Sequence, residues 1–241
     1  MGSNTARTLV IMPAWNEATV IGETIRELRD VAPHLDLLVV DDGSTDDTSE
    51  VARRAGARVL TLPYNLGVGG ALRAGYKYAW RKGYDQAVQV DADGQHDPRE
   101  VDKVLAGLDM ADIVIGARFA GKGDYEARGP RRWAMRLLAT ALSAVADTTR
   151  SDVTSGFRAG NRSAIQQYTR HYPAEYLGDT VDSLMTAVRS GHSVIQVPVA
   201  MRPRQGGTPS KSPAKAAIYL FRSLFALLIA STRRTTRREG A

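Results

Sequence analysis

Short apolar runs alternate with segments of helical spacing along the first half of the chain. The runs are rich in Val, Ile and Leu, as in Thr8–Met12 and Leu37–Val40, which is typical of buried strands. Between them, apolar residues recur three and four positions apart, as in amphipathic helices. The pattern predicts strands at residues 8–12, 37–40, 58–62, 86–90 and 113–115, and helices at 18–31, 45–55, 69–82 and 98–108. Because strands alternate with helices, we expect an α/β fold with a mainly parallel, Rossmann-like sheet flanked by helices.

The second half of the sequence is less regular. Its spacing predicts an amphipathic helix over residues 131–147, a further helix over 180–189 and a strand over 193–199. A segment rich in Pro and Gly, residues 203–213, precedes a final apolar helix at about 214–230, which carries basic residues along one narrow stripe. This last pattern suits a helix lying at a membrane surface, and a helix packed on the core or on a second subunit is the alternative.

Acidic clusters follow three of the predicted strands. They are Trp15-Asn16-Glu17, Asp41-Asp42 and Asp91-Ala92-Asp93. In a parallel sheet the carboxyl ends of the strands meet at one edge, where ligands bind, so we expect these clusters to converge. We expect Ser44 and Asp97 to cap helices, but capping requires neither adjacent carboxylates nor an Asp-x-Asp. The pattern therefore favours a binding site.

Asp91 and Asp93 lie two residues apart where a strand passes into a turn. This arrangement suits Mg²⁺ or Mn²⁺, since Mg²⁺ is usually held by one or two carboxylates together with waters and substrate phosphates. An EF-hand is excluded because His96 stands where such a loop needs glycine. We expect a divalent cation that clamps a diphosphate.

A glycine-rich segment, Asn65–Ala71, follows the third predicted strand. A dinucleotide-binding loop would follow the first strand and carry a third glycine at a set spacing, so that hypothesis is not favoured. We expect a tight turn that lets the backbone approach a ligand before a helix begins.

Composition and charge narrow the class of protein. The chain has 241 residues, no cysteine, and four histidines without metal-binding spacing, which excludes disulfide frameworks and cysteine nucleophiles and argues against zinc. The net charge of +6 is unevenly placed, because residues 201–241 hold nine Lys or Arg and one Glu. A basic tail beside an apolar helix suits an anionic membrane surface, and we do not expect a nucleic-acid partner. Since no signal-peptide pattern and no apolar stretch of about 20 residues is found, we expect a cytoplasmic protein.

Seven motifs in a fixed order carry a family resemblance. They are PAWNE, VVDDGSTDDT, NLGVGGAL, VDADGQHDP, IGARF, SGFRAGNRSA and VPVAMRPRQGGTPSKS. Over residues 8–215 the chain resembles the inverting family 2 glycosyltransferases, and within them the polyprenyl-phosphate (dolichol-phosphate) mannosyl- and glucosyltransferase branch. The resemblance implies a GT-A fold, a nucleotide-diphosphate sugar donor, Mg²⁺ or Mn²⁺, and a polyprenyl phosphate acceptor.

The resemblance also implies a donor site. Its nucleotide-binding residues would be Pro13, Trp15, Glu17, Val40, Asp42 and Ala92. Trp15 stands where the family usually has tyrosine, and its ring either stacks on the base or is an ordinary core side chain. The metal would be held by Asp91, Asp93 and Gln95, and Asp93 is also a catalytic candidate.

Basic residues in the second half would face the phosphates. The resemblance assigns this part to Arg118, to Arg131 or Arg132, and to the pair Arg204 and Lys211, with Arg204 as a catalytic candidate. The loop RQGGTPSK is one residue longer than the usual R-x-x-G-x-S-K, so Arg202 competes with Arg204 for the role of the arginine.

The expected catalytic base of many family members is missing. They carry a Glu-Asp pair whose second carboxylate deprotonates a sugar hydroxyl, and here the pair falls at Asp179-Thr180. A hydroxyl acceptor needs such a base, whereas a phosphate monoester is largely dianionic and nucleophilic near neutral pH. The missing base and the SGFR and R…SK motifs favour a phosphate acceptor. Asp179 or Asp182 stays open as a base or as a residue that only caps or flanks a helix.

We therefore predict a GT-A domain over residues 1–212, with a nucleotide-sugar half at about 1–118 and an acceptor half at about 119–212. A C-terminal amphipathic helix and basic tail would occupy residues 213–241. The predicted reaction is metal-dependent transfer of a hexose to polyprenyl phosphate at the cytoplasmic face of a membrane, with GDP-mannose favoured as donor over UDP-glucose. The alternatives are a glycan or other hydroxyl acceptor, and a non-catalytic protein that binds a nucleotide sugar. A homo-oligomer or a membrane-protein partner is compatible with the tail.

Overall fold

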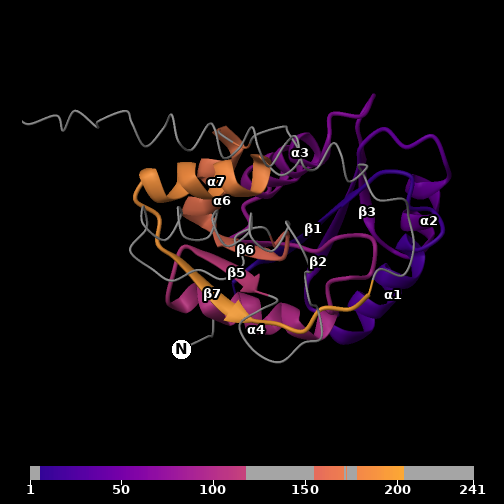
Figure 1. The fold of residues 1–241 in the computed structure, drawn as a ribbon. Helices are drawn as coiled ribbons and strands as arrows, with labels where there is room; N and C mark the ends of the chain where they lie inside the picture. The colour runs from indigo at the N-terminus through magenta and orange to yellow at the C-terminus, as the bar shows by residue number, and fades with distance from the viewer. Residues whose placement is uncertain (1–5, 118–154, 171, 173–177, 204–241) are drawn as a thin grey trace, which may run out of the picture.

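The computed structural model describes residues 6–117, 155–170, 172 and 178–203, with the backbone alone at 178–182 and 185. Its strands are β1 (Thr8–Ala14), β2 (Asp36–Asp41), β3 (Arg58–Thr61), β4 (Gln86–Gln89), β5 (Ile113–Ala117), β6 (Arg158–Asn161) and β7 (Val194–Pro198). They form one seven-stranded sheet in the order β3-β2-β1-β4-β6-β5-β7 (Figure 1).

One strand, β6, runs antiparallel to both of its neighbours, while the other paired strands of this sheet are parallel. The prediction of a mainly parallel sheet is confirmed. The pattern does not predict β6, because its sequence, Arg-Ala-Gly-Asn, lacks the β-branched and aromatic residues that are typical of strands. The strand is made by packing: a Cβ at Gly160 would lie 3.0 Å from the Cβ of Ala164.

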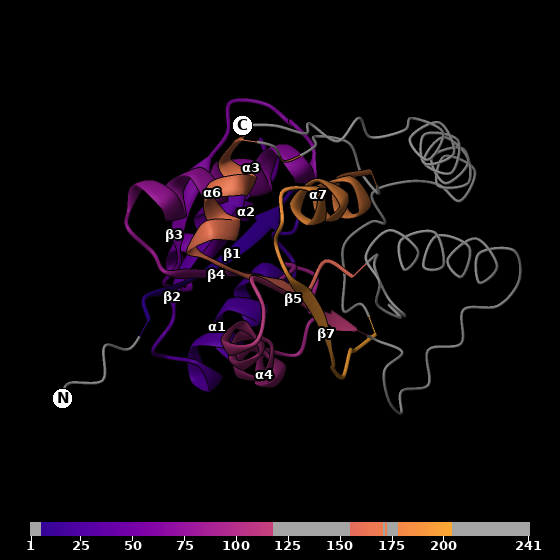
Figure 2. The same ribbon diagram turned by 90° about the vertical axis from the view of Figure 1, so that its left-hand side faces the viewer.

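The helices cover both faces of the sheet. They are α1 (Ile21–Val31), α2 (Thr48–Arg54), α3 (Val68–Arg81), α4 (Val101–Ala106), α6 (Arg162–Arg170) and α7 (Gly178–Arg189). Figure 2 shows α3, α6 and α7 on one side of the sheet and α1 and α4 on the other. Successive residues of β1 alternate between the two cores, since Leu9 packs with the first group of helices and Val10 with the second. Burial on both faces explains the continuous apolar runs of the sequence.

The observed helices differ from the predicted ones mainly at their ends. The helix expected at 98–108 is α4 between two short 3₁₀ helices, Pro98–Glu100 and Gly107–Asp109. Asp97 caps the first of these as predicted, because its side chain accepts a hydrogen bond from the backbone N–H of Arg99. The cap predicted at Ser44 is wrong, since α2 begins at Thr48. The side chain of Ser44 instead accepts a hydrogen bond from the loop after β1.

The second half of the fold is described in part. The sequence pattern missed α6, and α7 begins two residues before the helix that was predicted at 180–189. The helices expected at 131–147 and 214–230 lie outside the described residues. In the part of the chain that the structure describes, no helix is both long and apolar enough to cross a bilayer.

The glycine-rich segment lets α3 pack directly on the sheet. Gly67 precedes the helix with a φ of 81°, and a Cβ on Gly75 would lie 2.4 Å from a methyl group of Ile11. The segment is therefore a turn and a helix start, as predicted, and this close approach brings the turn to the carboxyl edge of the sheet.

Candidate active site

The ends of β1, β2 and β4 lie side by side at one edge of the sheet. The register pairs Ala14 with Asp41 on one side of β1 and Ile11 with Gln89 on the other. Just beyond the strands, the backbone N–H of Asp42 donates to the carbonyl of Ala14 at 2.8 Å. The three acidic clusters therefore converge at one edge, which confirms the geometry that the pattern predicted.

Hydrogen bonds join the loop after β1 to the loop after β2. Asn16 adopts a left-handed conformation, with a φ of 55°, and its Oδ1 accepts from the backbone N–H of Thr45 at 2.9 Å. The backbone N–H of Asn16 donates to Oγ of Ser44, and that of Glu17 to Oγ1 of Thr48, each at 2.9 Å. The position of the residues after β1 is thus fixed by the residues after β2.

The predicted nucleotide-binding residues differ in exposure. Trp15 is 45% exposed, so it is not a core tryptophan and its ring is accessible at this edge of the sheet. Pro13 is partly buried in β1, and Glu17 is buried. Val40 is completely buried among core residues, so its side chain does not reach the surface of this edge.

Asp42 is buried and held by the glycine-rich turn. Its Oδ1 accepts from the backbone N–H of Leu66 at 2.7 Å. Burial raises the pKa of Asp42, although the backbone N–H groups of Leu66 and Gly67 oppose this effect. Gly43 makes the contact possible, since a Cβ there would lie 2.7 Å from the carbonyl carbon of Tyr64. The turn therefore positions a carboxylate at the base of the site.

The loop after β4 carries the predicted metal ligands. The side chain of Asp91 is 34% exposed, whereas Asp93 is buried. Oδ1 of Asp93 accepts from the backbone N–H of Gln95 at 3.0 Å, which closes a tight turn. The carbonyl of Ala92, between the two aspartates, accepts from Oγ1 of Thr24 in α1 at 3.1 Å.

This donor set fits a divalent cation that shares its coordination with a ligand. Among the described residues, no group of three or more His, Asp or Glu side chains is gathered to hold a metal ion. Mg²⁺ is usually bound by one or two carboxylates together with waters and substrate phosphates, not by an all-protein cage. Two carboxylates and an amide, from Asp91, Asp93 and Gln95, match that requirement in their chemistry.

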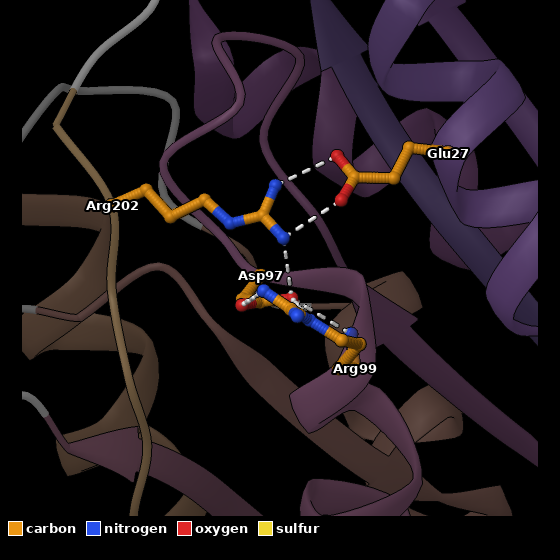
Figure 3. A network of polar contacts seen from close by, with 4 residues as sticks. All are labelled: Glu27, Asp97, Arg99 and Arg202. Carbon is orange, nitrogen blue, oxygen red and sulfur yellow. Dashed lines mark hydrogen bonds and ion pairs between the residues drawn. The ribbon is translucent and has the colours of Figure 1, made fainter.

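Arg202 crosses the same loop and binds two carboxylates (Figure 3). Its guanidinium nitrogens lie 2.7 Å from each oxygen of Glu27 in α1, and Nη2 donates to Oδ1 of Asp97 at 2.8 Å. Its backbone N–H donates to the carbonyl of Gln95 at 2.9 Å. The bond to Glu27 raises the pKa of Arg202. Burial alone would raise the pKa of Asp97, but hydrogen bonds from Arg99 and the charge of Arg202 hold it below its usual value.

These contacts decide what the Arg202 guanidinium does in this structure. It is engaged by carboxylates of the protein itself and fastens the chain after β7 across the loop of the predicted metal ligands. Arg204, the other candidate for the arginine of the R-x-x-G-x-S-K motif, lies outside the described residues.

Other predicted residues also lie outside the described part of the chain. These are Arg118, Arg131, Arg132 and Lys211. Asp179 is in the first turn of α7, where the structure describes only the backbone. Their roles stay predictions.

Arg158 of the SGFR motif, which favours a phosphate acceptor in the sequence, is buried in the structure. It is 1% exposed, and its Nε donates to the carbonyl of Ser155 at 2.9 Å. Its Nη1 donates to Oγ of Ser183 in α7 at 3.2 Å. The guanidinium thus joins β6 to α7 inside the protein instead of presenting charge to an acceptor at the surface.

Two buried polar residues lie beside Asp91, and neither was predicted as a site residue from the sequence. Gln89 and His96 are each 4% exposed, and both contact Asp91. The signal for Gln89 is a polar residue inside the apolar run Val88–Val90, where an apolar side chain is expected.

Residues 9–169 match the family described as glycosyl transferase family 2. The chain belongs to this family, and it is a glycosyltransferase with a GT-A fold. The polyprenol monophosphomannose synthase of Mycolicibacterium smegmatis is 30% identical to it over 234 residues, which cover 90% of this chain and 86% of the relative. The undecaprenyl-phosphate mannosyltransferase of Micrococcus luteus is 32% identical over 216 residues, which cover 86% of this chain and 88% of the relative.

A solved structure shares the fold. The glucosyl-3-phosphoglycerate synthase of Mycobacterium tuberculosis, crystallised with Mn²⁺, UDP-glucose and phosphoglyceric acid, superposes with a TM-score of 0.70 at 24% identity. The match covers 94% of this chain and 79% of that one. At this identity the likeness shows the fold, and the GT-A prediction is confirmed.

Proposed function

We propose that the protein transfers a hexose from a nucleotide-diphosphate sugar to a polyprenyl phosphate at a membrane surface. The observation that carries the proposal is the convergence of Asp42 and the Asp91–Asp93 loop at one sheet edge, in a chain similar over nearly its whole length to two enzymes named for this reaction. GDP-mannose is the favoured donor because both relatives are named for mannose transfer, and UDP-glucose is second.

The donor would lie along this edge. The exposed ring of Trp15 stacks on the base, and the buried carboxylate of Asp42 accepts a hydrogen bond from a base N–H. Pro13, Glu17 and the main chain at Val40 and Ala92 complete the walls of this pocket. The backbone N–H of Leu66 holds this carboxylate in place.

Asp91, Asp93 and Gln95 would hold Mg²⁺ or Mn²⁺. The cation supplies positive charge for the departing diphosphate, which is a principal electrostatic contribution to such a reaction. Arg118, Arg131 or Arg132, Arg204 and Lys211 are proposed to add positive charge around the same phosphates.

The acceptor phosphate is proposed as the nucleophile. One of its oxygens attacks the anomeric carbon of the sugar and forms the new C–O bond. The bond from that carbon to the diphosphate oxygen breaks on the opposite face, so the anomeric centre inverts and the electron pair leaves with the nucleoside diphosphate. No proton must be removed from a dianionic phosphate, which agrees with threonine at position 180 beside Asp179.

A polyprenyl phosphate is held in a bilayer, so the enzyme must reach it there. The apolar, basic sequence at 214–230 and the arginines of the tail suit an interfacial helix on an anionic, cytoplasmic membrane face. A second copy or a membrane-protein partner would strengthen that attachment.

Transfer of label from GDP-mannose and from UDP-glucose to a polyprenyl phosphate in detergent tests the proposal. The full chain is assayed with Mg²⁺ or Mn²⁺ and with EDTA, and Asp93→Asn is compared with Asp109→Asn, a change at an exposed acid distant from the site in sequence. We expect metal-dependent label in the lipid from one donor, which Asp93→Asn abolishes and Asp109→Asn leaves intact. Label found only on soluble glycans, or on no acceptor, would overturn the lipid-phosphate assignment.

A further inference from the structure

Two buried polar side chains lie directly beneath the carboxylate of Asp91. Gln89 is the last residue of β4, and His96 lies five residues beyond Asp91 in the loop that follows. Each is only 4% exposed. Buried polar groups of this kind are retained when they have specific partners.

The partner of both side chains is Asp91. Nε2 of Gln89 donates to Oδ1 of Asp91 at 2.9 Å. Nδ1 of His96 accepts from the backbone N–H of Asp91 at 3.0 Å, so the proton of the neutral ring is on Nε2. That Nε2 lies 3.5 Å from Oδ2 of the same carboxylate. Gln89 thus bonds to the carboxylate of Asp91, and His96 bonds to its backbone N–H with the ring edge 3.5 Å from the second carboxylate oxygen.

The segment before β6 closes this arrangement from the other side. A Cβ on Gly156 would lie 2.9 Å from Nε2 of Gln89 and 3.2 Å from Oδ2 of Asp91. The ring of Phe157 stacks on His96, with centroids 4.8 Å apart and planes at 13°. The imidazole is thus held between the loop of the metal ligands and a strand from the second half of the chain.

A purely structural role does not explain why two buried polar groups gather at Asp91, one on its carboxylate and one on its backbone N–H, when that carboxylate is itself 34% exposed. An exposed carboxylate can be satisfied by water, whereas a carboxylate that binds a metal is commonly oriented by a second layer of hydrogen bonds. An ionised carboxylate has about four lone-pair sites, so the bond from Gln89 leaves others for a cation.

We infer that Gln89 and His96 are positioning residues, which orient the Asp91 carboxylate for a divalent cation while the 156–157 segment holds them in place. The inference rests on the proposed function, because it takes Asp91 as a metal ligand. It extends that function by making metal affinity depend on two side chains that do not touch the metal.

Gln89→Leu and His96→Phe are the variants that test it. The first removes the amide at similar volume, and the second keeps an aromatic ring to stack on Phe157. His96→Gln places an amide nitrogen near the position of Nε2 and is the conservative rescue. Gln86→Leu is the matched control, since Gln86 lies on the same strand at its opposite end and bonds to Thr8.

The first measurement is Mn²⁺ affinity of the full chain with saturating GDP or UDP, followed by electron paramagnetic resonance, together with the melting temperature. We expect Gln89→Leu and His96→Phe to bind Mn²⁺ about 10- to 100-fold more weakly, with His96→Gln between them and the wild type. Gln86→Leu should bind as the wild type does. Raising the Mn²⁺ concentration should restore transfer by the positioning variants but not by Asp91→Asn.

Failure of this inference and failure of the proposed function give different results. If the wild type binds Mn²⁺ and Asp91→Asn does not, wild-type affinity in both positioning variants overturns the inference alone. If the wild type with nucleotide binds no Mn²⁺, the proposed metal is wrong and the inference falls with it.

Discussion

Carboxylates stand at both edges of the sheet, and their partners differ. At the edge where β5 begins, Asp112 accepts hydrogen bonds from the backbone N–H and Oγ of Ser193 and from Nδ2 of Asn161, each at 2.8 Å. These bonds lower the pKa of Asp112 to about 2. At the same edge Asp36 lies 3.6 Å from a guanidinium nitrogen of Arg7 and of Arg58.

The opposite edge, called the uncompensated edge below, lacks such ion pairs with Lys or Arg at Asp41, Asp42 and Asp91 in the described part of the chain, although these carboxylates accept hydrogen bonds. There, no Lys or Arg of the described residues forms an ion pair with Asp41, Asp42 or Asp91. The hydrogen bonds of Asp42 come from the backbone, and burial raises its pKa. Carboxylates such as Asp41, Asp42 and Asp91, which pair with no Lys or Arg of the described residues, favour a positive ligand, whereas Asp36 and Asp112 at the other edge are explained by the fold.

The largest expected effect is the loss of a carboxylate at the uncompensated edge. Asp93→Asn should lower the rate of sugar transfer by about 10³-fold, because charge stabilisation of the leaving group is lost. The melting temperature should change little, because the amide oxygen of Asn can still accept the hydrogen bond from the backbone N–H of Gln95. Steady-state assays with calorimetry check both, and a fall in stability with an unchanged rate would place Asp93 in the fold instead of the site.

This comparison also shows which parts of the molecule the sequence could predict. The strands of the first 117 residues were predictable because both faces of the sheet are buried and the runs are continuous. The convergence of the acidic clusters needed only the rule for parallel strands. β6 was not predictable, because Arg158, Gly160 and Asn161 are poor strand formers that are held there by packing.

Contacts between distant segments explain most of the remaining differences. Arg202 bonds to Glu27, which lies 175 positions away in the sequence, and no local sequence pattern indicates such a pair. The exposure of Trp15 depends on how the loops after β1 and β2 are joined, so the sequence left stacking and core packing equally open. Motifs identify residue types, whereas the three-dimensional contacts decide whether a residue such as Arg158 faces a ligand or the interior.

The second largest expected effect is on donor affinity, through Trp15, which is exposed at the uncompensated edge. Trp15→Ala should weaken donor binding by about 10- to 100-fold, because base stacking on an aromatic ring contributes about 1–3 kcal/mol. Trp15→Phe should recover most of the affinity. Stability should not change in either variant, since the ring is 45% exposed. Isothermal titration with the nucleoside diphosphate measures this, and equal affinity in Trp15→Ala would exclude stacking.

Arg202 tests the comparison from the other direction. It forms ion pairs with Glu27 and Asp97 close to the carboxylates that have no such pair. Arg202→Gln should cost about 1–2 kcal/mol, since the bonds to Glu27 and Asp97 are charge-assisted but partly exposed to solvent. For a chain of this size the melting temperature should fall by roughly 3–6 °C. Arg54→Gln is the control, because its exposed pair with Glu50 should contribute less than about 0.5 kcal/mol. Equal effects in the two variants would show that the clamp contributes no more than a surface pair.

The smallest effect is a pH dependence at the compensated edge. The folded-state pKa of Asp112 is about 2 and its ordinary value is 3.8, so the ionised group stabilises the fold fully above about pH 4. That contribution is lost as the pH falls from about 4 toward 2. Asp112→Asn should therefore melt lower than the wild type at pH 7, with the gap narrowing as acid is added, while donor affinity at pH 7 is unchanged. If the difference in melting temperature stays constant down to pH 3, the bonds to Ser193 and Asn161 do not depend on the charge of Asp112. The contrast between the two edges would then lie in hydrogen bonding alone.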